Sequence, residues 1–212
     1  MKLRNRRDAG LRLARKLDKY ARAKDVIVLG IPRGGVPVAY EIAAELEVSL
    51  DIFLSHKLGV PGNEELAFGA VAAGDGRFVN ESTIKAAGIS NEQIEEITQA
   101  TRRELEERAQ LYRAGRPRLE VEGRIVILVD DGIATGASMY AAVHALRQMK
   151  PSKLVVAAPV APASTCEWLL SAVDELVVLS APVTFYAVGQ FYEHFGQVSD
   201  EEVAALLQNA TD

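Results

Sequence analysis

The chain is poor in several features that would point to whole classes of protein. It has a single cysteine, Cys166, among 212 residues, so it can form no internal disulfide and no zinc site built from cysteines. Its richest apolar stretch, 154–163, is broken by two prolines and is far shorter than the roughly 20 residues of a membrane helix. The basic N-terminus lacks the apolar region of a signal peptide. We therefore expect a cytoplasmic protein that does not contact membranes.

An excess of basic residues is also missing. The sequence has 24 Lys and Arg against 29 Asp and Glu, a formal net charge of −5, which argues against nonspecific nucleic-acid binding. Its three histidines, His56, His144 and His194, are scattered, so a histidine metal site is not expected. Neither a G-x-S-x-G nor a G-x-x-x-x-G-K-[ST] motif occurs. These absences exclude a serine hydrolase of the G-x-S-x-G type and a P-loop nucleoside triphosphatase, and they leave an enzyme of another class or a protein that binds a small ligand.

The distribution of apolar residues predicts an α/β fold. Unbroken apolar runs of the kind found in doubly covered parallel strands alternate with helical stripes. We expect a single domain over 1–212, with three α/β/α layers and a mostly parallel sheet. The expected strands are 26–31, 50–56, 124–131, 153–160 and 175–180, and the expected helices are 8–22, 36–46, 135–149, 162–172 and a short one after Ser199.

Two segments differ from this rhythm and are expected, together with the N-terminus, to form a cap. Residues 57–118 read as a loop (57–65), a hairpin around Gly74–Asp75–Gly76, and one long helix (90–113) with Ser90 as its N-cap. The narrow apolar side of that helix suits a cover over a site or a contact in a homodimer. Residues 182–212 hold an aromatic cluster whose main expected role is core packing, although a flat nucleobase could stack on one ring: Phe185, Tyr186, Phe191, Tyr192 and Phe195.

The stretch IVILVDDGIATGAS, residues 125–138, carries the most chemical information. A buried strand leads to Asp130 and Asp131, and a loop of small residues then opens into a helix. Small side chains and a helix N-terminus make a phosphate cradle, with the hydroxyls of Thr135 and Ser138 as further donors. The acids would repel a phosphate, so they should face vicinal hydroxyls or a hydrated Mg²⁺. This pattern indicates a phosphorylated sugar; the alternative is a strand-end acid beside a tight turn.

This stretch resembles the ribose-phosphate-binding signature of type I phosphoribosyltransferases. The resemblance implies 5-phosphoribosyl-1-pyrophosphate as donor, Mg²⁺ as cofactor, and contacts of Asp130 and Asp131 with the ribose hydroxyls and with the metal, either directly or through water. It assigns the 5′-phosphate to the following loop. The segments RRDAG, IPRGG, ELAFGA, YRAGRP and AVGQFYEHF resemble a bacterial group of predicted phosphoribosyltransferases whose substrate is unsettled. The implied substrate-binding residues of the second loop are Gly132, Ala134, Thr135, Gly136, Ala137 and Ser138.

A second glycine-containing turn, Ile31-Pro32-Arg33-Gly34-Gly35, follows the first strand. Its spacing is not G-x-G-x-x-G, and the next strand ends without a ribose-binding acid, so dinucleotide binding is disfavoured. The resemblance makes it the pyrophosphate loop, formed by Arg33, Gly34 and Gly35, with a strained or cis peptide expected at Pro32–Arg33 or Arg33–Gly34. The alternative is a plain tight turn. If this strand lies beside the one ending at Asp130, both loops line one crevice.

The resemblance also implies a mobile loop after the second strand, at 59–65, with Lys57 as a second cation; a surface lysine is the alternative. The expected catalytic residues are thus Arg33, Lys57 and Asp131. The expected reaction is transfer of the phosphoribosyl group to a nitrogen acceptor with release of pyrophosphate. Ala134 occupies the position of an aspartate found in hypoxanthine-guanine enzymes, which disfavours a 6-oxopurine acceptor. A non-catalytic nucleotide or sugar-phosphate sensor is the main alternative, and a nucleotide-sugar or nucleoside hydrolase of similar fold is a third.

Overall fold

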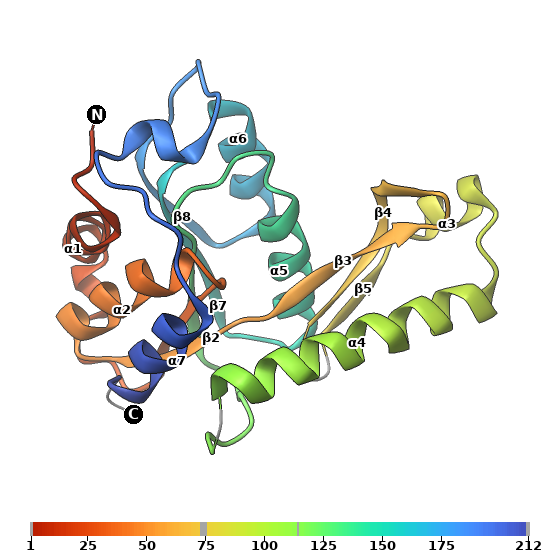
Figure 1. The fold of residues 1–212 in the computed structure, drawn as a ribbon, viewed down its shortest axis with the longest axis horizontal. Helices are drawn as coiled ribbons and strands as arrows, with labels where there is room; N and C mark the ends of the chain where they lie inside the picture. The colour runs from red at the N-terminus through yellow and green to blue at the C-terminus, as the bar shows by residue number, and fades with distance from the viewer. Residues whose placement is uncertain (1, 73–75, 114, 211–212) are drawn as a thin grey trace. The chain divides into compact units, whose positions relative to one another are not determined.

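The structure, a computed structural model, describes residues 2–72, 76–113 and 115–210 (Figure 1). The described chain divides into two compact units. The first comprises Met1–Phe53, Val121–Gly136 and Pro151–Asp212, and the second comprises Leu54–Glu120 and Ala137–Lys150. Because the chain passes between the units several times, the second unit is formed by two separate insertions into the first.

The first unit is built on a five-stranded sheet in the order β2-β1-β6-β7-β8, in which every neighbouring pair is parallel. Both faces of such a sheet are covered, which explains why its central strands β1 and β6 are apolar runs; all five residues of β1 are buried. The prediction of an α/β fold with a mostly parallel sheet is confirmed. The strands are β1 (Val26–Gly30), β2 (Ser49–Ile52), β6 (Ile125–Val129), β7 (Lys153–Val160) and β8 (Glu175–Ser180).

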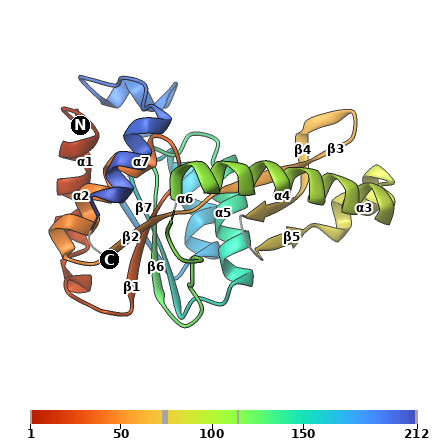
Figure 2. The ribbon, with the colours of Figure 1, turned by 60° about the horizontal axis from the view of Figure 1, so that its bottom comes forward.

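Helices flank this sheet on both sides, as Figures 1 and 2 show. Three of them, α1 (Arg6–Lys16), α2 (Gly35–Leu46) and α7 (Asp200–Gln208), lie on one side, and α6 (Ala163–Ala172) lies on the other. Two short 3-10 helices complete the unit, η1 (Asp18–Tyr20) and η2 (Val188–Phe191). The helix predicted at 8–22 instead spans Arg6–Lys16. It begins earlier because the Asn5 side chain accepts a hydrogen bond from the Asp8 amide and caps α1. It is also shorter, and η1 follows it.

The pairing of β1 with β6 decides where a ligand can bind. Gly30, the last residue of β1, is opposite Val129, the last residue of β6. From this pair, β1 is followed by β2 on one side and β6 by β7 on the other, so the edge beyond Gly30 and Val129 is a topological switch point of the sheet. The loops that follow the two strands therefore start side by side, as a shared site requires.

The second unit contains an antiparallel sheet of β3 (Ser55–Val60), β4 (Asn63–Ala72) and β5 (Arg77–Val79) in that order. Its helices are α3 (Glu81–Ala87), α4 (Asn91–Arg113) and α5 (Ala137–Gln148). The long helix was predicted, and its capping box is present: the Gln93 amide donates to Ser90 Oγ at 3.2 Å, and the Ser90 amide donates to Gln93 Oε1 at 3.0 Å.

Two expectations for this region are wrong. The strand predicted at 50–56 is divided, because its first part pairs with β1 and the part from Ser55 onward pairs with β4. The predicted loop 57–65 instead forms much of the β3–β4 hairpin. Gly59 lies at two register shifts, Leu58/Gly59 and Gly59/Val60, since a bulge lets a ladder continue through a residue of low strand propensity. Pro61 and Gly62 form the turn between the two strands. Two residues of the predicted turn, Gly74 and Asp75, lie outside the described residues.

Among the described residues, no helix combines the length and the apolar character needed to cross a bilayer.

A carboxylate at the start of β8 ties the end of the α1 region to the sheet. Glu175 accepts hydrogen bonds from Tyr20 Oη at 2.6 Å, Lys19 Nζ at 2.8 and 2.9 Å, and Lys153 Nζ at 2.9 Å. Partial burial raises the pKa of Glu175, but these donors outweigh burial and lower its pKa to about 2. The ionised form of Glu175 is therefore favoured in the folded chain.

Replacement of Glu175 by Gln is expected to lower the free energy of unfolding near neutral pH by about 1 kcal/mol, since solvent screens part of the interaction. A carboxyl group with a depressed folded pKa stabilises above its unfolded pKa, and this contribution is lost as pH falls toward the folded value of about 2. The free energies of unfolding of the unaltered and variant proteins, measured in urea, should thus converge as pH is lowered below about 5. A difference that stays constant down to about pH 3 would contradict this account.

Candidate active site

The turn after β1 lies directly against the two acids that follow β6. A Cβ on Gly34 would overlap the carboxylate of Asp131, and a Cβ on Gly35 would lie 2.6 Å from the Val129 carbonyl oxygen and 2.9 Å from Asp130 Cα. Only glycine allows this approach at either position. The Pro32–Arg33 peptide bond is cis, at one of the two bonds singled out by the resemblance. The structure thus brings the predicted pyrophosphate loop and the predicted diol-binding acids together.

The acid pair is in an unusual electrostatic environment. Burial, and then the neighbouring charge of Asp131, raise the pKa of Asp130 well above its ordinary value. Burial also raises the pKa of Asp131, while hydrogen bonding and charge attraction from Arg6 oppose this. Two adjacent carboxylates in a poorly hydrated position favour a ligand or cation that supplies hydrogen-bond donors or positive charge.

Two hydrogen bonds hold the first half of the loop that follows the acids. The Ile133 amide donates to the Val160 carbonyl at 2.9 Å, and Thr165 Oγ1 donates to the Ala134 carbonyl at 3.0 Å. Ala134 and Thr135 are exposed. Gly136 has φ +82°, and the ring of Trp168 lies 3.0 Å from where its Cβ would be, so a side chain there would be both strained and crowded. This geometry suits a preformed anion-binding loop.

A segment before α1 pairs with a segment before α7 beside this site. The Leu3 amide donates to the Phe191 carbonyl at 2.8 Å and the Glu193 amide donates to the Leu3 carbonyl at 2.8 Å; residues 3–6 and 191–196 are called here the paired terminal segments. Arg6 Nε donates to Asp131 Oδ2 at 2.7 Å. Tyr192 Oη donates to the Asp131 carbonyl at 2.6 Å. Two residues that lie far apart in the sequence, Arg6 and Tyr192, therefore hold Asp131 in place.

The remaining predicted site residues are distributed over both units. Arg33 is exposed, and its Nη1 lies 3.8 Å from Asp200 Oδ1 at the start of α7. Gly132 is packed against Val188. Lys57 is on β3, opposite Ala70, in the second unit. Ala137 and Ser138 are the first residues of α5 and also belong to the second unit, whereas residues 132–136 belong to the first.

The aromatic residues of the C-terminal segment mostly contact one another. Phe185 and Phe191 have ring centroids 5.3 Å apart, and Tyr192 and Phe195 have centroids 4.9 Å apart. Tyr186, by contrast, is 86% exposed. Packing is therefore the role of most of this cluster, and Tyr186 presents the most open ring of the five.

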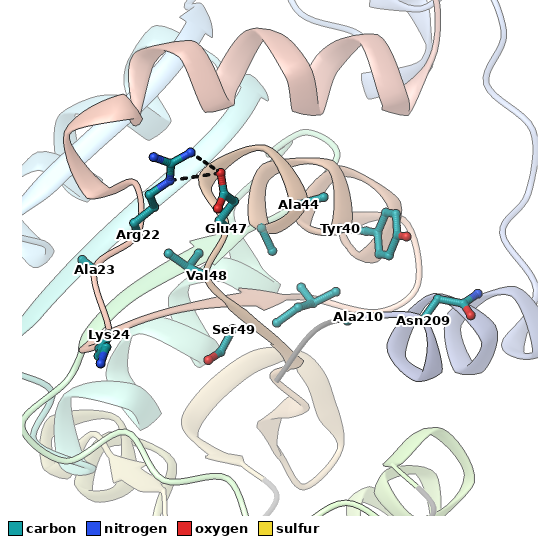
Figure 3. Close-up of a pocket in the computed structure, with 12 residues that line it drawn as sticks. Arg22, Ala23, Lys24, Tyr40, Ala44, Glu47, Val48, Ser49, Asn209 and Ala210 are labelled. Atoms are coloured by element: carbon teal, nitrogen blue, oxygen red, sulfur yellow. Dashed lines mark hydrogen bonds and ion pairs between the residues drawn. The ribbon is translucent and has the colours of Figure 1, made fainter.

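A separate pocket of about 530 Å³ lies near the amino ends of the strands (Figure 3). It is lined in part by Lys24, which precedes β1, and Ser49, which begins β2. An ion pair between Arg22 and Glu47 at 2.6 Å borders it. None of the predicted site residues lines this pocket, and ligands of open α/β sheets bind at the carboxyl ends of the strands, so we separate it from the candidate active site.

Two adjacent acids follow β6, and a small-residue loop follows each of β1 and β6, at the switch point of a parallel sheet where open α/β folds bind ligands. The chain matches the family model of the phosphoribosyl transferase domain over residues 2–169. It therefore belongs to the phosphoribosyl transferase domain family.

Two Mycobacterium tuberculosis proteins are each 42% identical to the chain over 206 residues: Rv0571c of strain ATCC 25618 / H37Rv and MT0597 of strain CDC 1551 / Oshkosh. Both names give phosphoribosyl transferase as a provisional assignment. The match covers 97% of this chain and 46% of each relative, so the chain spans about half the length of these curated relatives.

The crystal structure of TT1426 from Thermus thermophilus is similar over 98% of both chains, with a TM-score of 0.88 and 43% identity. AQ2163 from Aquifex aeolicus has a TM-score of 0.50 at 13% identity, over 82% of this chain and 73% of that one. The second likeness concerns the fold alone.

Four residues contact the acids or the loop after them, and the sequence did not predict these contacts: Arg6, Thr165, Trp168 and Tyr192. Arg6 is part of the RRDAG segment and Tyr192 of AVGQFYEHF, so both lie in segments that carried the family resemblance. Thr165 and Trp168 lie on α6, where helical periodicity gives no indication that they face a loop.

We expect Gly35→Ala to destabilise the protein by about 2 kcal/mol, because its methyl group would meet backbone atoms that cannot move aside. Gly34→Ala should be milder for stability, since the atoms nearest to its methyl group belong to the Asp131 side chain rather than to the backbone, although moving that side chain would break its hydrogen bond with Arg6. Thermal unfolding measures both effects. Gly196→Ala is the matched control, because nothing lies within 4 Å of the position that its methyl group would take; equal melting temperatures of the Gly35→Ala and Gly196→Ala variants would refute the packing argument.

Proposed function

We propose that the chain transfers the 5-phosphoribosyl group from 5-phosphoribosyl-1-pyrophosphate to a nitrogen of a small acceptor and releases pyrophosphate. Membership of the phosphoribosyl transferase domain family supports this proposal. The single observation that carries it is the contact of Gly34 and Gly35 with Asp131 and Asp130. Through that contact, a pyrophosphate held by the first loop and a ribose diol held by the acids would belong to one donor molecule.

The proposed roles follow from the charge that develops during transfer. Positive charge grows on the ribose as the bond to pyrophosphate breaks, and negative charge grows on the leaving group, so catalysis is mainly electrostatic and positional. Arg33 and the backbone of Gly34 and Gly35 would stabilise the leaving pyrophosphate, with Lys57 as a further cation. Asp131, with Asp130, would hold the hydroxyls near the developing positive charge. The 5′-phosphate would bind the loop after the acids: Gly132, Ala134, Thr135, Gly136, Ala137 and Ser138.

Mg²⁺ is part of the proposal. The described residues contain no group of three or more His, Cys, Asp or Glu side chains that could hold a metal ion on their own. This is compatible with Mg²⁺, which commonly binds one or two carboxylates together with substrate phosphates and water. Asp130 and Asp131 would supply the carboxylate oxygens, directly or through water. When bound, the ion would neutralise part of the charge of the leaving group.

For the acceptor, we propose a nucleobase-like ring that is not a 6-oxopurine. Ala134 offers no side-chain group to act on a purine ring, and its carbonyl already accepts from Thr165. Tyr186 is exposed, so a flat acceptor could stack on its ring. Stacking of two aromatic rings adds to the binding free energy beyond what the buried area contributes.

The combined change Asp130→Asn and Asp131→Asn is expected to abolish measurable binding of 5-phosphoribosyl-1-pyrophosphate, because the diol loses two charged acceptors. Calorimetric titration in the presence of Mg²⁺ measures this. The matched control is Asp18→Asn with Asp25→Asn, two exposed acids of the same unit, which should bind as the unaltered protein does. Unchanged affinity in the Asp130/Asp131 variant would remove the basis of the assignment.

An acceptor screen separates transfer from the alternatives. The protein is incubated with the donor, Mg²⁺ and a panel of nucleobases, and released pyrophosphate is measured. Transfer predicts release that depends on one class of base. Release without any base would indicate a hydrolase, and donor binding without release under any condition would indicate a sensor.

Binding at the loop after the acids should be visible in fluorescence. Trp168 is the only tryptophan of the sequence and packs against Gly136, so ribose 5-phosphate should change its emission by altering that contact. The titration midpoint should agree with the calorimetric one. Calorimetric binding with no change in emission would show that the sugar phosphate binds elsewhere.

A further inference from the structure

We propose that Arg6 is the positioning residue of the site: it fixes the carboxylate of Asp131 so that one oxygen is left to accept a hydrogen bond from the ribose diol. This inference rests on the proposed function, since it assigns Arg6 a role in binding the sugar of that reaction. It concerns a residue that precedes Asp131 by 125 positions and belongs to α1.

Asp131 is held from three directions. Its amide donates to Asp130 Oδ1 at 2.8 Å, its carbonyl accepts from Tyr192 Oη at 2.6 Å, and its Oδ2 accepts from Arg6 Nε at 2.7 Å. The first two bonds fix the backbone, and the bond from Arg6 fixes the side chain. The remaining carboxylate oxygen, Oδ1, is the atom we assign to a ribose hydroxyl.

Arg6 is itself unusually well fixed for an arginine. Its Nη1 donates to the Gly196 carbonyl at 2.7 Å, and its guanidinium carbon lies 4.1 Å from the centroid of the Phe195 ring. Its side chain is 13% exposed, the same fraction as that of Asp131. A planar guanidinium can make these two hydrogen bonds and stack on a ring at once, whereas a lysine ammonium cannot reproduce the arrangement.

The position of Arg6 depends on pairing of the chain ends. Hydrogen bonds between the paired terminal segments fix the chain just before it enters α1, including one from the His194 amide to the Arg4 carbonyl at 3.0 Å. Asn5 then caps α1, and Arg6 is the first helical residue. The arginine is therefore delivered to Asp131 by backbone structure, which is what a positioning role requires.

The surroundings of Asp131 explain why its carboxylate needs a tether. It lies against Gly34 on one side and next to Asp130 in the chain, so it adjoins both the proposed pyrophosphate loop and a second acid. A free carboxylate here would repel the anionic donor and could rotate away from the diol. A fixed cation on Oδ2 reduces the first effect and prevents the second.

A pocket of about 370 Å³ also borders Arg6, lined in part by Arg7, Glu41 and His194. In a variant that lacks the Arg6 side chain, this pocket gives a small guanidinium ion a route to the vacated position. Chemical rescue is therefore a direct test of whether the guanidinium group itself is required.

The test compares binding of ribose 5-phosphate with binding of its 2-deoxy and 3-deoxy analogues, measured by calorimetry. Asp131→Asn first identifies the analogue that reports on Asp131. The unaltered protein should bind ribose 5-phosphate roughly tenfold or more tightly than it binds that deoxy analogue, because the analogue lacks one hydrogen bond to a charged group. Arg6→Gln should reduce this preference to within about twofold, and Arg6→Lys should leave it intermediate.

Arg7→Gln is the matched control. Arg7 is the next residue of the same helix, its side chain is 74% exposed, and it pairs with Glu41 at 3.4 Å, so its loss should leave the preference intact. In Arg6→Ala, millimolar guanidinium should restore the preference in part and should have no effect on Arg7→Gln. A purely structural role of Arg6 would weaken binding of all three sugars equally and keep their ratio.

The outcomes separate this inference from the proposed function. If the unaltered protein binds no ribose 5-phosphate, both are overturned. If it binds with the expected preference and Arg6→Gln and Arg6→Lys keep that preference, the assignment of Arg6 alone is overturned. Should Arg6→Gln fail to fold, Arg6→Lys and the guanidinium rescue decide the question. Their readout is again the ratio of the affinities for ribose 5-phosphate and the selected deoxy analogue.

Discussion

The parallel pairing of β1 with β6 is the constraint on which the rest of the site depends. The two strands end at the same level, Gly30 opposite Val129, so the turns that follow them have to share one narrow space. That space is so small that neither Gly34 nor Gly35 has room for a methyl group. The chain therefore gives up side chains on one turn to accommodate two acids on the other. Under the proposed function, this contact would place recognition of the diol and of the pyrophosphate within one ligand's length.

A second group of contacts keeps these turns in place, and most of its members come from far away in the sequence. Thr165 and Trp168 of α6 hold the loop after the acids, while Arg6 and Tyr192 hold Asp131. Buried acids that adjoin each other tend to take up protons or turn away, as the raised pKa values of Asp130 and Asp131 indicate. The paired terminal segments oppose this by supplying a fixed cation. Preorganisation of this kind is a large part of how a site favours a charged transition state.

Much of the fold and the centre of the site could be predicted from the sequence, because both depend on local patterns. Apolar runs of the right length indicated the parallel strands, and the acid pair with its small-residue loop marked the end of β6. The prediction was wrong where tertiary pairing outweighed local propensity: of the loop predicted at 57–65 only Pro61 and Gly62 form a turn, and the flanking residues form strands, because β3 and β4 pair with each other. Arg6 could not be assigned from the sequence, since its contact with Asp131 spans 125 positions and no spacing rule reaches that far. Lys57 and the acceptor remain predictions.

The central proposal is that the turn after β1 and the loop after β6 bind the two ends of a single donor. Its most direct test is to compare the affinities of 5-phosphoribosyl-1-pyrophosphate, ribose 5-phosphate and pyrophosphate for the unaltered protein, in the presence of Mg²⁺, by calorimetry. Two linked groups that bind neighbouring sites gain effective concentration, so the donor should bind at least about 100-fold more tightly than either fragment. A donor affinity no greater than that of ribose 5-phosphate would contradict the account, because the turn at Gly34 and Gly35 would then contribute nothing to binding.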